Sequence, residues 1–270
     1  MGQSFYEADA DARAVFDEAS ELLGYDMKAL CFEENEKLNL TQYTQPAMVT
    51  TGIAIMKVVE KQGLLPDTAA GLSLGEYEAL YAAGALSVTD AIRVVARRGE
   101  LMEAAVPAGV GAMAAVLGAE ASLIEETLSE IPEVWIANYN CPGQIVISGK
   151  KEAVEAAAEA LKARGIKRVL MLNVSGPFHS GLLREAGEAL GKVLAETEIH
   201  PLRIPYYANV TGDIVEDAAK VRGLLTEQVY SSVRFEQSIR NMLSAGVDTF
   251  YELGPGKTLA GFVKKIDREA

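Results

Sequence analysis

The sequence predicts an α/β protein with a parallel sheet and a second, smaller unit inserted into it. The first observation is that apolar residues recur at helical spacing in several segments, as in 7–23. The second is that short apolar runs of strand type, such as 68–71, alternate with these helices. The third is that a central stretch of about 65 residues follows a different order, with two strands in succession.

The outer segments are expected to form the parallel-sheet core. Pro46 stands where a helix begins, because proline suits the first helical position. The expected order is a helix at 7–23, a helix at 46–62, a strand at 68–71, helices at 75–84 and 88–105, a helix at 180–196, a strand at 205–208, helices at 217–230 and 235–244, a strand at 249–253 and a closing helix.

The central segments are expected to form a ferredoxin-like subdomain. The expected elements are strands at 111–117, 134–138, 144–148 and 167–174, with helices at 121–131 and 151–163. This βαββαβ order is the split βαβ unit. Glycine and proline at 107–109 and 176–177 mark its edges. We therefore expect a discontinuous core of residues 1–106 and 177–270 around a subdomain of residues 107–176.

Composition excludes several classes of protein. The net charge of −13 argues against nucleic-acid binding, which needs a basic face. No apolar run reaches the roughly 18–20 residues that span a membrane, and the N-terminus lacks a signal pattern. Only two cysteines occur, and no histidine–carboxylate cluster has metal-ligand spacing. We expect a cytoplasmic protein without a metal site.

Residues 71–75, Gly-Leu-Ser-Leu-Gly, fit the nucleophile-elbow pattern. A predicted strand precedes this GxSxG pentad and a predicted helix follows it, as the motif requires. The glycines permit a sharp turn, and the helix N-terminus supplies amide donors for an oxyanion. Ser73 is therefore a candidate nucleophile. The alternative is an ordinary strand–helix turn.

The candidates for a base and for a carboxylate-binding group are few. His179 lies at a junction between elements, where catalytic groups are common, although a capping or packing histidine is the alternative. His200 lies in a polar stretch before Pro201 and is expected at the surface. Arg97 is expected on a solvated face. Arg98 could bind a substrate carboxylate through two hydrogen bonds or could also be solvated, and spacing does not choose.

Eight blocks in one order resemble the malonyl-CoA:acyl carrier protein transacylases of bacterial fatty-acid synthesis. The resemblance runs from Met1 to about Ile266 and implies a hydrolase-like α/β core with a ferredoxin-like insert. The blocks are residues 44–47, 71–77, 98–102, 111–116, 138–144, 176–180, 233–235 and 252–257.

The resemblance also implies a mechanism. Ser73 attacks the malonyl thioester, and His179 acts first as general base and then as acid. The acyl-enzyme then passes malonyl to the phosphopantetheine thiol of acyl carrier protein in a ping-pong cycle. A main-chain carbonyl near Gln228 orients the histidine, and the amide of Leu74 contributes to the oxyanion hole.

The same resemblance implies the substrate contacts. Arg98 pairs with the malonyl carboxylate, and the bulk of Phe178 disfavours an α-methyl group. Coenzyme A enters as part of the substrate, and no separate cofactor is expected. The expected partners are malonyl-CoA and acyl carrier protein, and we expect a monomer.

Two departures from the family pattern leave three hypotheses open. Leu72 stands where the family usually has histidine. The family normally begins with a strand and a Phe-Pro-Gly-Gln-Gly-Ser-Gln loop whose glutamine helps form the oxyanion hole, and Met1 aligns just beyond that loop. The chain is then an active transacylase, a catalytically weakened homologue that still binds acyl carrier protein, or a serine thioesterase.

Docking of an acidic carrier protein needs local positive charge on this acidic chain. We predict that one of two basic groups rims the mouth of the site, although scattered solubilising residues are the alternative. The first group is Lys162, Arg164, Lys167 and Arg168, and the second is Lys257, Lys264 and Lys265.

Overall fold

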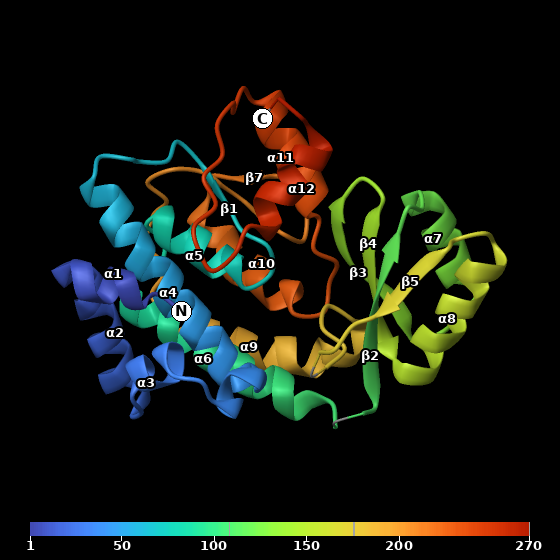
Figure 1. Ribbon diagram of the computed structural model, residues 1–270, viewed down its shortest axis with the longest axis horizontal. Helices are drawn as coiled ribbons and strands as arrows, with labels where there is room; N and C mark the ends of the chain where they lie inside the picture. Colours follow the sequence, from blue (N-terminus) through green and yellow to red (C-terminus); the bar gives the residue numbers. More distant parts are fainter. Residues whose placement is uncertain (108, 175, 270) are drawn as a thin grey trace.

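The computed structural model describes residues 1–107, 109–174 and 176–269. Figure 1 shows a larger, mainly helical part that carries both termini and a smaller part built on a separate sheet. The larger part contains α1 (Gln3–Ala8), α2 (Ala10–Leu23), α3 (Met27–Phe32), η1 (Glu36–Asn39), α4 (Thr41–Lys61), β1 (Ala69–Ala70), α5 (Gly75–Ala82), α6 (Val88–Ala105), η2 (Gly181–Leu183), α9 (Arg184–Glu196), β6 (Tyr206–Tyr207), β7 (Ile214–Val215), η3 (Ala218–Lys220), α10 (Val221–Gln228), α11 (Phe235–Ser244) and α12 (Thr258–Ile266).

The sheet of the larger part is small. β1 and β6 run parallel, with Ala69 opposite Tyr206, and β7 pairs antiparallel with β6. The predicted parallel pairing is therefore present, but the third strand makes the sheet mixed. The predicted strand at 249–253 is wrong, because no described strand pairs with this segment. Instead, the Glu252 carboxylate accepts the N–H groups of Leu259 and Ala260 and caps the start of α12.

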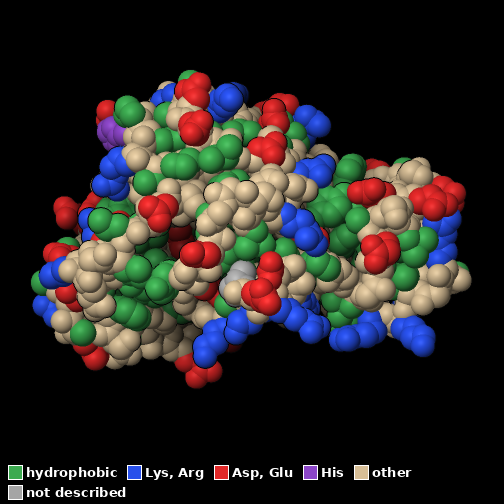
Figure 2. Space-filling view, turned by 90° about the horizontal axis from the view of Figure 1, so that it is seen from above, with side chains coloured by type: hydrophobic (Ala, Val, Ile, Leu, Met, Phe, Trp, Pro, Cys, Tyr) green, Lys and Arg blue, Asp and Glu red, His purple; other side chains and the backbone are tan. Residues whose placement is uncertain are grey.

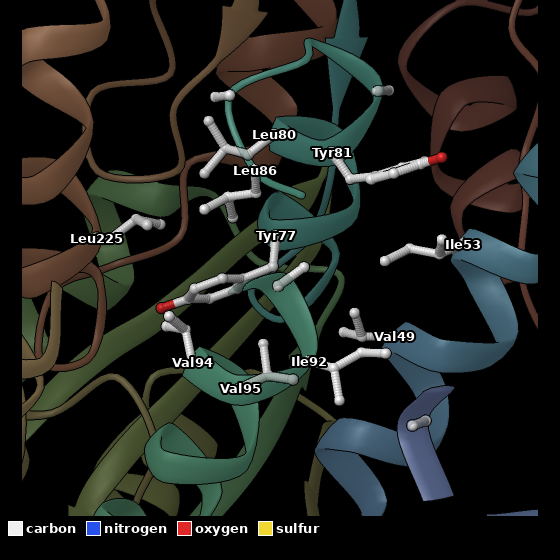
Figure 3. Packing of buried hydrophobic residues seen from close by; sticks show 14 of the residues in the cluster. Val49, Ile53, Tyr77, Leu80, Tyr81, Leu86, Ile92, Val94, Val95 and Leu225 are labelled. Atoms are coloured by element: carbon white, nitrogen blue, oxygen red, sulfur yellow. The ribbon is translucent and has the colours of Figure 1, made fainter. Parts of the chain in front are cut away.

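Most helices of the larger part pack through one apolar cluster, and α11 and α12 pack in a second one. Figure 3 shows Val49 and Ile53 of α4 turned toward Ile92 of α6 and Tyr81 of α5, and the three aliphatic side chains are fully buried. The prediction that Pro46 begins this helix is wrong, because α4 starts five residues earlier, at Thr41. Proline is tolerated there because its missing N–H removes a single hydrogen bond near the helix start.

The smaller part has the predicted βαββαβ order. It contains β2 (Gly111–Leu117), α7 (Ala121–Ser129), β3 (Val134–Cys141), β4 (Gln144–Lys150), α8 (Lys151–Ala163) and β5 (Arg168–Met171). The strands pair antiparallel in the order β3-β4-β2-β5. Helices α7 and α8 cover the face turned away from the larger part (Figure 1) and enclose a separate apolar cluster. Residues 108 and 175, beside the predicted boundaries, lie outside the described residues, and the division at 107 and 176 stays a prediction.

Backbone hydrogen bonds join the two parts. The N–H of Tyr139 on β3 donates to the carbonyl of Val233 over 2.8 Å, and the N–H of Val233 donates to the carbonyl of Ala137 over 2.8 Å. The segment that carries Val233 follows α10 directly. The insert is thereby anchored close to the end of α10. None of the helices in the described part of the chain is long and apolar enough to cross a membrane.

Candidate active site

Ser73 lies on a sharp turn between β1 and α5. Its φ of 54° is in the left-handed region, which costs a non-glycine residue about 1–3 kcal/mol and is common at active sites. A Cβ atom at Gly71 would lie 2.0 Å from the Gly75 backbone, so only glycine permits this turn. The Ser73 N–H donates to Asn209 Oδ1 over 2.6 Å, and this hydrogen bond helps to hold the strained backbone of the turn.

His179 is brought to Ser73 from 106 positions further along the chain. Its Nε2 lies 2.6 Å from Ser73 Oγ, and its Nδ1 lies 2.8 Å from the carbonyl oxygen of Gln228. Because a carbonyl only accepts, Nδ1 carries the proton and Nε2 accepts from the Ser73 hydroxyl. Burial, with the charge of Arg98, lowers the pKa of His179 to about 4. His179 is therefore a neutral base at pH 7.

Arg98 is buried beside the same hydroxyl group. Its Nη2 donates to Ser73 Oγ over 3.3 Å and to Gln228 Oε1 over 3.0 Å, and its Nη1 donates to Gln45 Oε1 over 2.8 Å. Its Nε is buried without a hydrogen-bond partner among the described residues. None of the ion pairs formed within the described ranges includes Arg98. A buried cation that lacks a directly bound anion can bind one.

The remaining predicted residues lie near this pair. The Leu74 N–H, at the start of α5, has no acceptor among the described residues and is available to an oxyanion. Phe178 is half-buried and packs against both the helical core and residues Met113 and Val146 of the smaller sheet. The structure brings these residues together but does not test their roles, which stay predictions.

Besides Gln45, which contacts Arg98, the sequence reasoning missed two buried polar residues of the site. Asn209 follows β6, and its Nδ2 donates to the carbonyl of Gly71 over 2.6 Å. Glu76 is fully buried, and its Oε2 accepts the N–H of Asn209 over 3.2 Å and Gln228 Nε2 over 2.8 Å. One available signal is that Asn209 comes just after the carboxyl end of β6, the strand parallel to β1, and ligand sites form at the carboxyl ends of parallel strands.

His200 and Arg97 are at the surface, as expected. His200 Nδ1 lies 3.6 Å from Glu198 Oε1, and the His200 side chain is 42% exposed, so it is not part of the buried site. Arg97 is half exposed and pairs with Glu100 on the same helix. No cluster of three or more potential metal ligands occurs in the described ranges.

Two cavities adjoin the site. The smaller has a volume of about 320 Å³ and is lined by His179, Trp135, Ile136, Val210, Tyr230, Ser231, Ser232 and Arg234. The larger, of about 820 Å³, adjoins the turn at Gly71 and Gly75 and is also lined by residues 67–70 and 247–253, among others. None of the seven predicted docking residues lines the smaller cavity, and Lys264 lines the larger one. Arg234 is the basic residue that lines the smaller cavity together with His179, and the sequence reasoning did not single it out.

Comparison with known proteins identifies the family. A family model described as acyl transferase domain matches residues 1–269. The malonyl CoA-acyl carrier protein transacylase of Bacillus subtilis (strain 168) is 48% identical over 273 residues, which cover 99% of this chain and 86% of that protein. The chain belongs to the malonyl CoA-acyl carrier protein transacylase family.

Solved structures of this transacylase family share the fold. The crystal structure of the Clostridium perfringens transacylase has a TM-score of 0.97 and 42% identity, and the match covers 100% of this chain and 86% of that one. A type II polyketide acyl-carrier protein has been solved in complex with its malonyl-transacylase, which matches with a TM-score of 0.94 and 40% identity over 98% of this chain and 87% of that one. The resemblance and the fold class inferred from the motifs are both confirmed.

Proposed function

We propose that this chain transfers a malonyl group from malonyl-CoA to the phosphopantetheine thiol of acyl carrier protein. The observation that carries the proposal is the contact of one hydroxyl group, Ser73 Oγ, with both a neutral base and a buried guanidinium. The base suits acyl transfer, and the guanidinium suits an acyl group that ends in a carboxylate. The names of the family members agree with this combination.

The first half-reaction forms an ester on Ser73. The Ser73 hydroxyl passes its proton to His179 Nε2 while Oγ forms a bond to the thioester carbonyl carbon. The Gln228 carbonyl holds the other ring nitrogen, so the imidazolium is stabilised and stays in place. The carbon–sulfur bond then breaks, and the coenzyme A thiolate takes the proton from His179. The free coenzyme A leaves with its thiol restored.

The second half-reaction repeats these steps in reverse with another thiol. The phosphopantetheine thiol gives its proton to His179, and its sulfur attacks the ester carbonyl. The Ser73 oxygen leaves and recovers the proton, so the enzyme returns to its first state. In this proposal, residues of one chain supply the nucleophile and the base, and coenzyme A enters only as part of the substrate.

The other site residues are assigned roles by position. The Leu74 N–H donates to the oxyanion that forms at the carbonyl oxygen, and removal of one such donor costs other enzymes about 10²–10³-fold in rate. Arg98 pairs with the malonyl carboxylate. Phe178, next to His179 and at the contact of the two parts, limits the width of the acyl pocket.

The carrier-protein arm is proposed to enter by the cavity at His179. This cavity has polar and aromatic walls and a basic residue, Arg234, that suit an amide-containing arm attached to its carrier protein through a phosphate. Figure 2 shows acidic and basic side chains interspersed on the face seen from above, with hydrophobic side chains between them. Local positive charge, rather than the overall charge, therefore guides docking.

The decisive experiment is intact-mass analysis of the chain after mixing with malonyl-CoA and quenching in acid. We expect a mass increase of one malonyl group, mapped to Ser73, that disappears when holo acyl carrier protein is added. Ser73→Ala should show no adduct, whereas Ser129→Ala, which removes an exposed hydroxyl on α7, should behave as the parent chain.

The outcomes separate the three hypotheses. An adduct that moves to the carrier protein supports the transferase. An adduct that decays to free malonate at the same rate with and without carrier protein indicates a thioesterase. Absence of any adduct, with binding of carrier protein retained, indicates a weakened homologue and contradicts the proposal.

A further inference from the structure

Glu76 is a buried carboxylate for which the transfer mechanism gives no task. It lies in the first turn of α5 and is 0% exposed. Its Oε2 accepts two hydrogen bonds, from the Asn209 N–H and from Gln228 Nε2. Its Oε1 is buried with no hydrogen-bond partner among the described residues. A proton can be added to such an unpaired carboxylate oxygen without breaking an existing hydrogen bond.

A single side chain connects Glu76 to Arg98. The amide of Gln228 donates from Nε2 to Glu76 Oε2 and accepts at Oε1 from Arg98 Nη2 over 3.0 Å. Glu76 is the carboxylate whose charge acts on Arg98, and Arg98 in turn favours the ionised form of Glu76. In the empty site, these two buried charges of opposite sign balance each other through one neutral amide.

We propose that Glu76 balances the charge of Arg98 in the empty site and takes up a proton from solvent when a substrate carboxylate pairs with Arg98. The proposal rests on the assignment of Arg98 as the carboxylate-binding group. Without proton uptake, the occupied site would hold two carboxylates and one guanidinium with little water to screen them. With proton uptake, the site keeps the net charge it had when empty.

The protonation equilibrium of the Glu76 carboxylate lies near neutral pH. Burial raises the pKa of Glu76 to about 7, although the hydrogen bonds from Gln228 and Asn209 and the charge of Arg98 oppose the rise. A substrate carboxylate beside Arg98 offsets that charge and adds a negative one, so the pKa of Glu76 rises further. The Tyr206 hydroxyl on β6 also acts on Glu76, and it is itself buried without a hydrogen-bond partner in the described ranges.

The tyrosines and the histidine around Glu76 keep their charge in this range, whereas Glu78 titrates within it but is not among the groups that act on Arg98. Burial raises the pKa values of Tyr77 and Tyr206 well above neutrality, so both stay protonated. His179 also faces Arg98, and its pKa of about 4 leaves it neutral. Burial raises the pKa of Glu78 to about 8, but its carboxylate lies against Gly52 of α4 rather than against Arg98.

The test is calorimetry of ligand binding in two buffers that differ in ionisation enthalpy. The Ser73→Ala chain binds thioesters without reacting, and malonyl-CoA and acetyl-CoA differ only in the carboxylate. We expect uptake of about half a proton per malonyl-CoA at pH 7, which approaches one proton at pH 8, and none with acetyl-CoA. The dissociation constant for malonyl-CoA should rise several-fold from pH 7 to pH 8, and at most about tenfold, while that for acetyl-CoA stays level.

Two matched variants identify the group that takes up the proton. Glu76→Gln on the same background keeps an oxygen for both hydrogen bonds but cannot be protonated, and uptake should disappear. Glu78→Gln removes the neighbouring, partly buried carboxylate, and uptake should persist. Uptake that survives in Glu76→Gln, or equal uptake with both thioesters, overturns the inference.

The failure of this inference can be distinguished from failure of the proposed function. Stronger binding of malonyl-CoA than of acetyl-CoA without proton uptake contradicts the role of Glu76 alone. Equal binding of the two thioesters, with no effect of Arg98→Ala on either, contradicts the assignment of Arg98 and the inference with it.

Discussion

The two sheets of this protein stabilise their surroundings in different ways. The four-stranded sheet has ladders of up to seven residue pairs and encloses an apolar cluster of its own. The three-stranded sheet has strands of only two residues, yet the candidate active site lies at its edge. There, the buried side chains of Glu76, Asn209 and Gln228 connect the turn, the strand end and the end of α10.

This difference shows how a reactive turn is held without a long ladder. A two-residue strand sets the direction of the chain but forms few hydrogen bonds. Each buried polar side chain, by contrast, can hold several atoms of its neighbours in place through hydrogen bonds. Such networks are sensitive to the loss of a single member, because the partner left behind is buried and unsatisfied. Changes at the three-stranded sheet should therefore affect rate, and changes at the four-stranded sheet should affect stability.

The largest effect is expected from Arg98→Ala. Loss of a buried charged partner should lower kcat/KM for malonyl-CoA by about 10²-fold or more, with little change for acetyl-CoA. Arg97→Ala, which removes the exposed neighbour on the same helix, is the matched control and should retain full activity. Steady-state kinetics with both thioesters, corrected for folded fraction, checks the prediction. An equal loss with both substrates would contradict a specific contact with the carboxylate.

An intermediate effect on the rate of Ser73 acylation is expected when the pH is lowered. Because the pKa of His179 is lowered to about 4, acylation of Ser73 should stay level from pH 6.5 to pH 5 and fall about tenfold per pH unit below pH 4. The unfolded chain binds this proton more readily, so His179 also reduces stability as the pH falls from 6.5 to 4. Rapid-quench measurement of acylation across this range provides the test. A midpoint near pH 6.5 would show that His179 is not buried as described.

The smallest effect on activity is expected from the four-stranded sheet. Ile147 on β4 is fully buried in its apolar cluster, and Ile147→Ala should lower the free energy of unfolding by about 2–5 kcal/mol. Ile147→Val should cost about 0.5–1.5 kcal/mol. The activity per folded molecule should be unchanged in both, as measured by denaturant titration together with transfer kinetics. A large loss of activity in the folded Ile147→Val protein would show that the two sheets are coupled.

Much of the local structure could be predicted from the sequence. The helices over 88–105, 151–163 and 235–244 have the predicted bounds, because each has a periodic apolar face, and Ser87 also caps the first of them. The GxSxG turn was also predictable, since Gly71 is required by the close approach to Gly75. The strand at 249–253 could not be judged in this way, because an apolar run forms a strand only where a neighbour completes its hydrogen bonds.

The sequence by itself determined the candidate nucleophile, the order of elements in the smaller part and the family to which the chain is similar. These properties can be inferred from local patterns of residues in the sequence. Only the tertiary structure decided that Arg98 is buried, and that Glu76 and Asn209 belong to the site. Burial and long-range hydrogen bonds arise when distant segments meet, and Gln228 lies 155 positions from the Ser73 carbonyl that it binds.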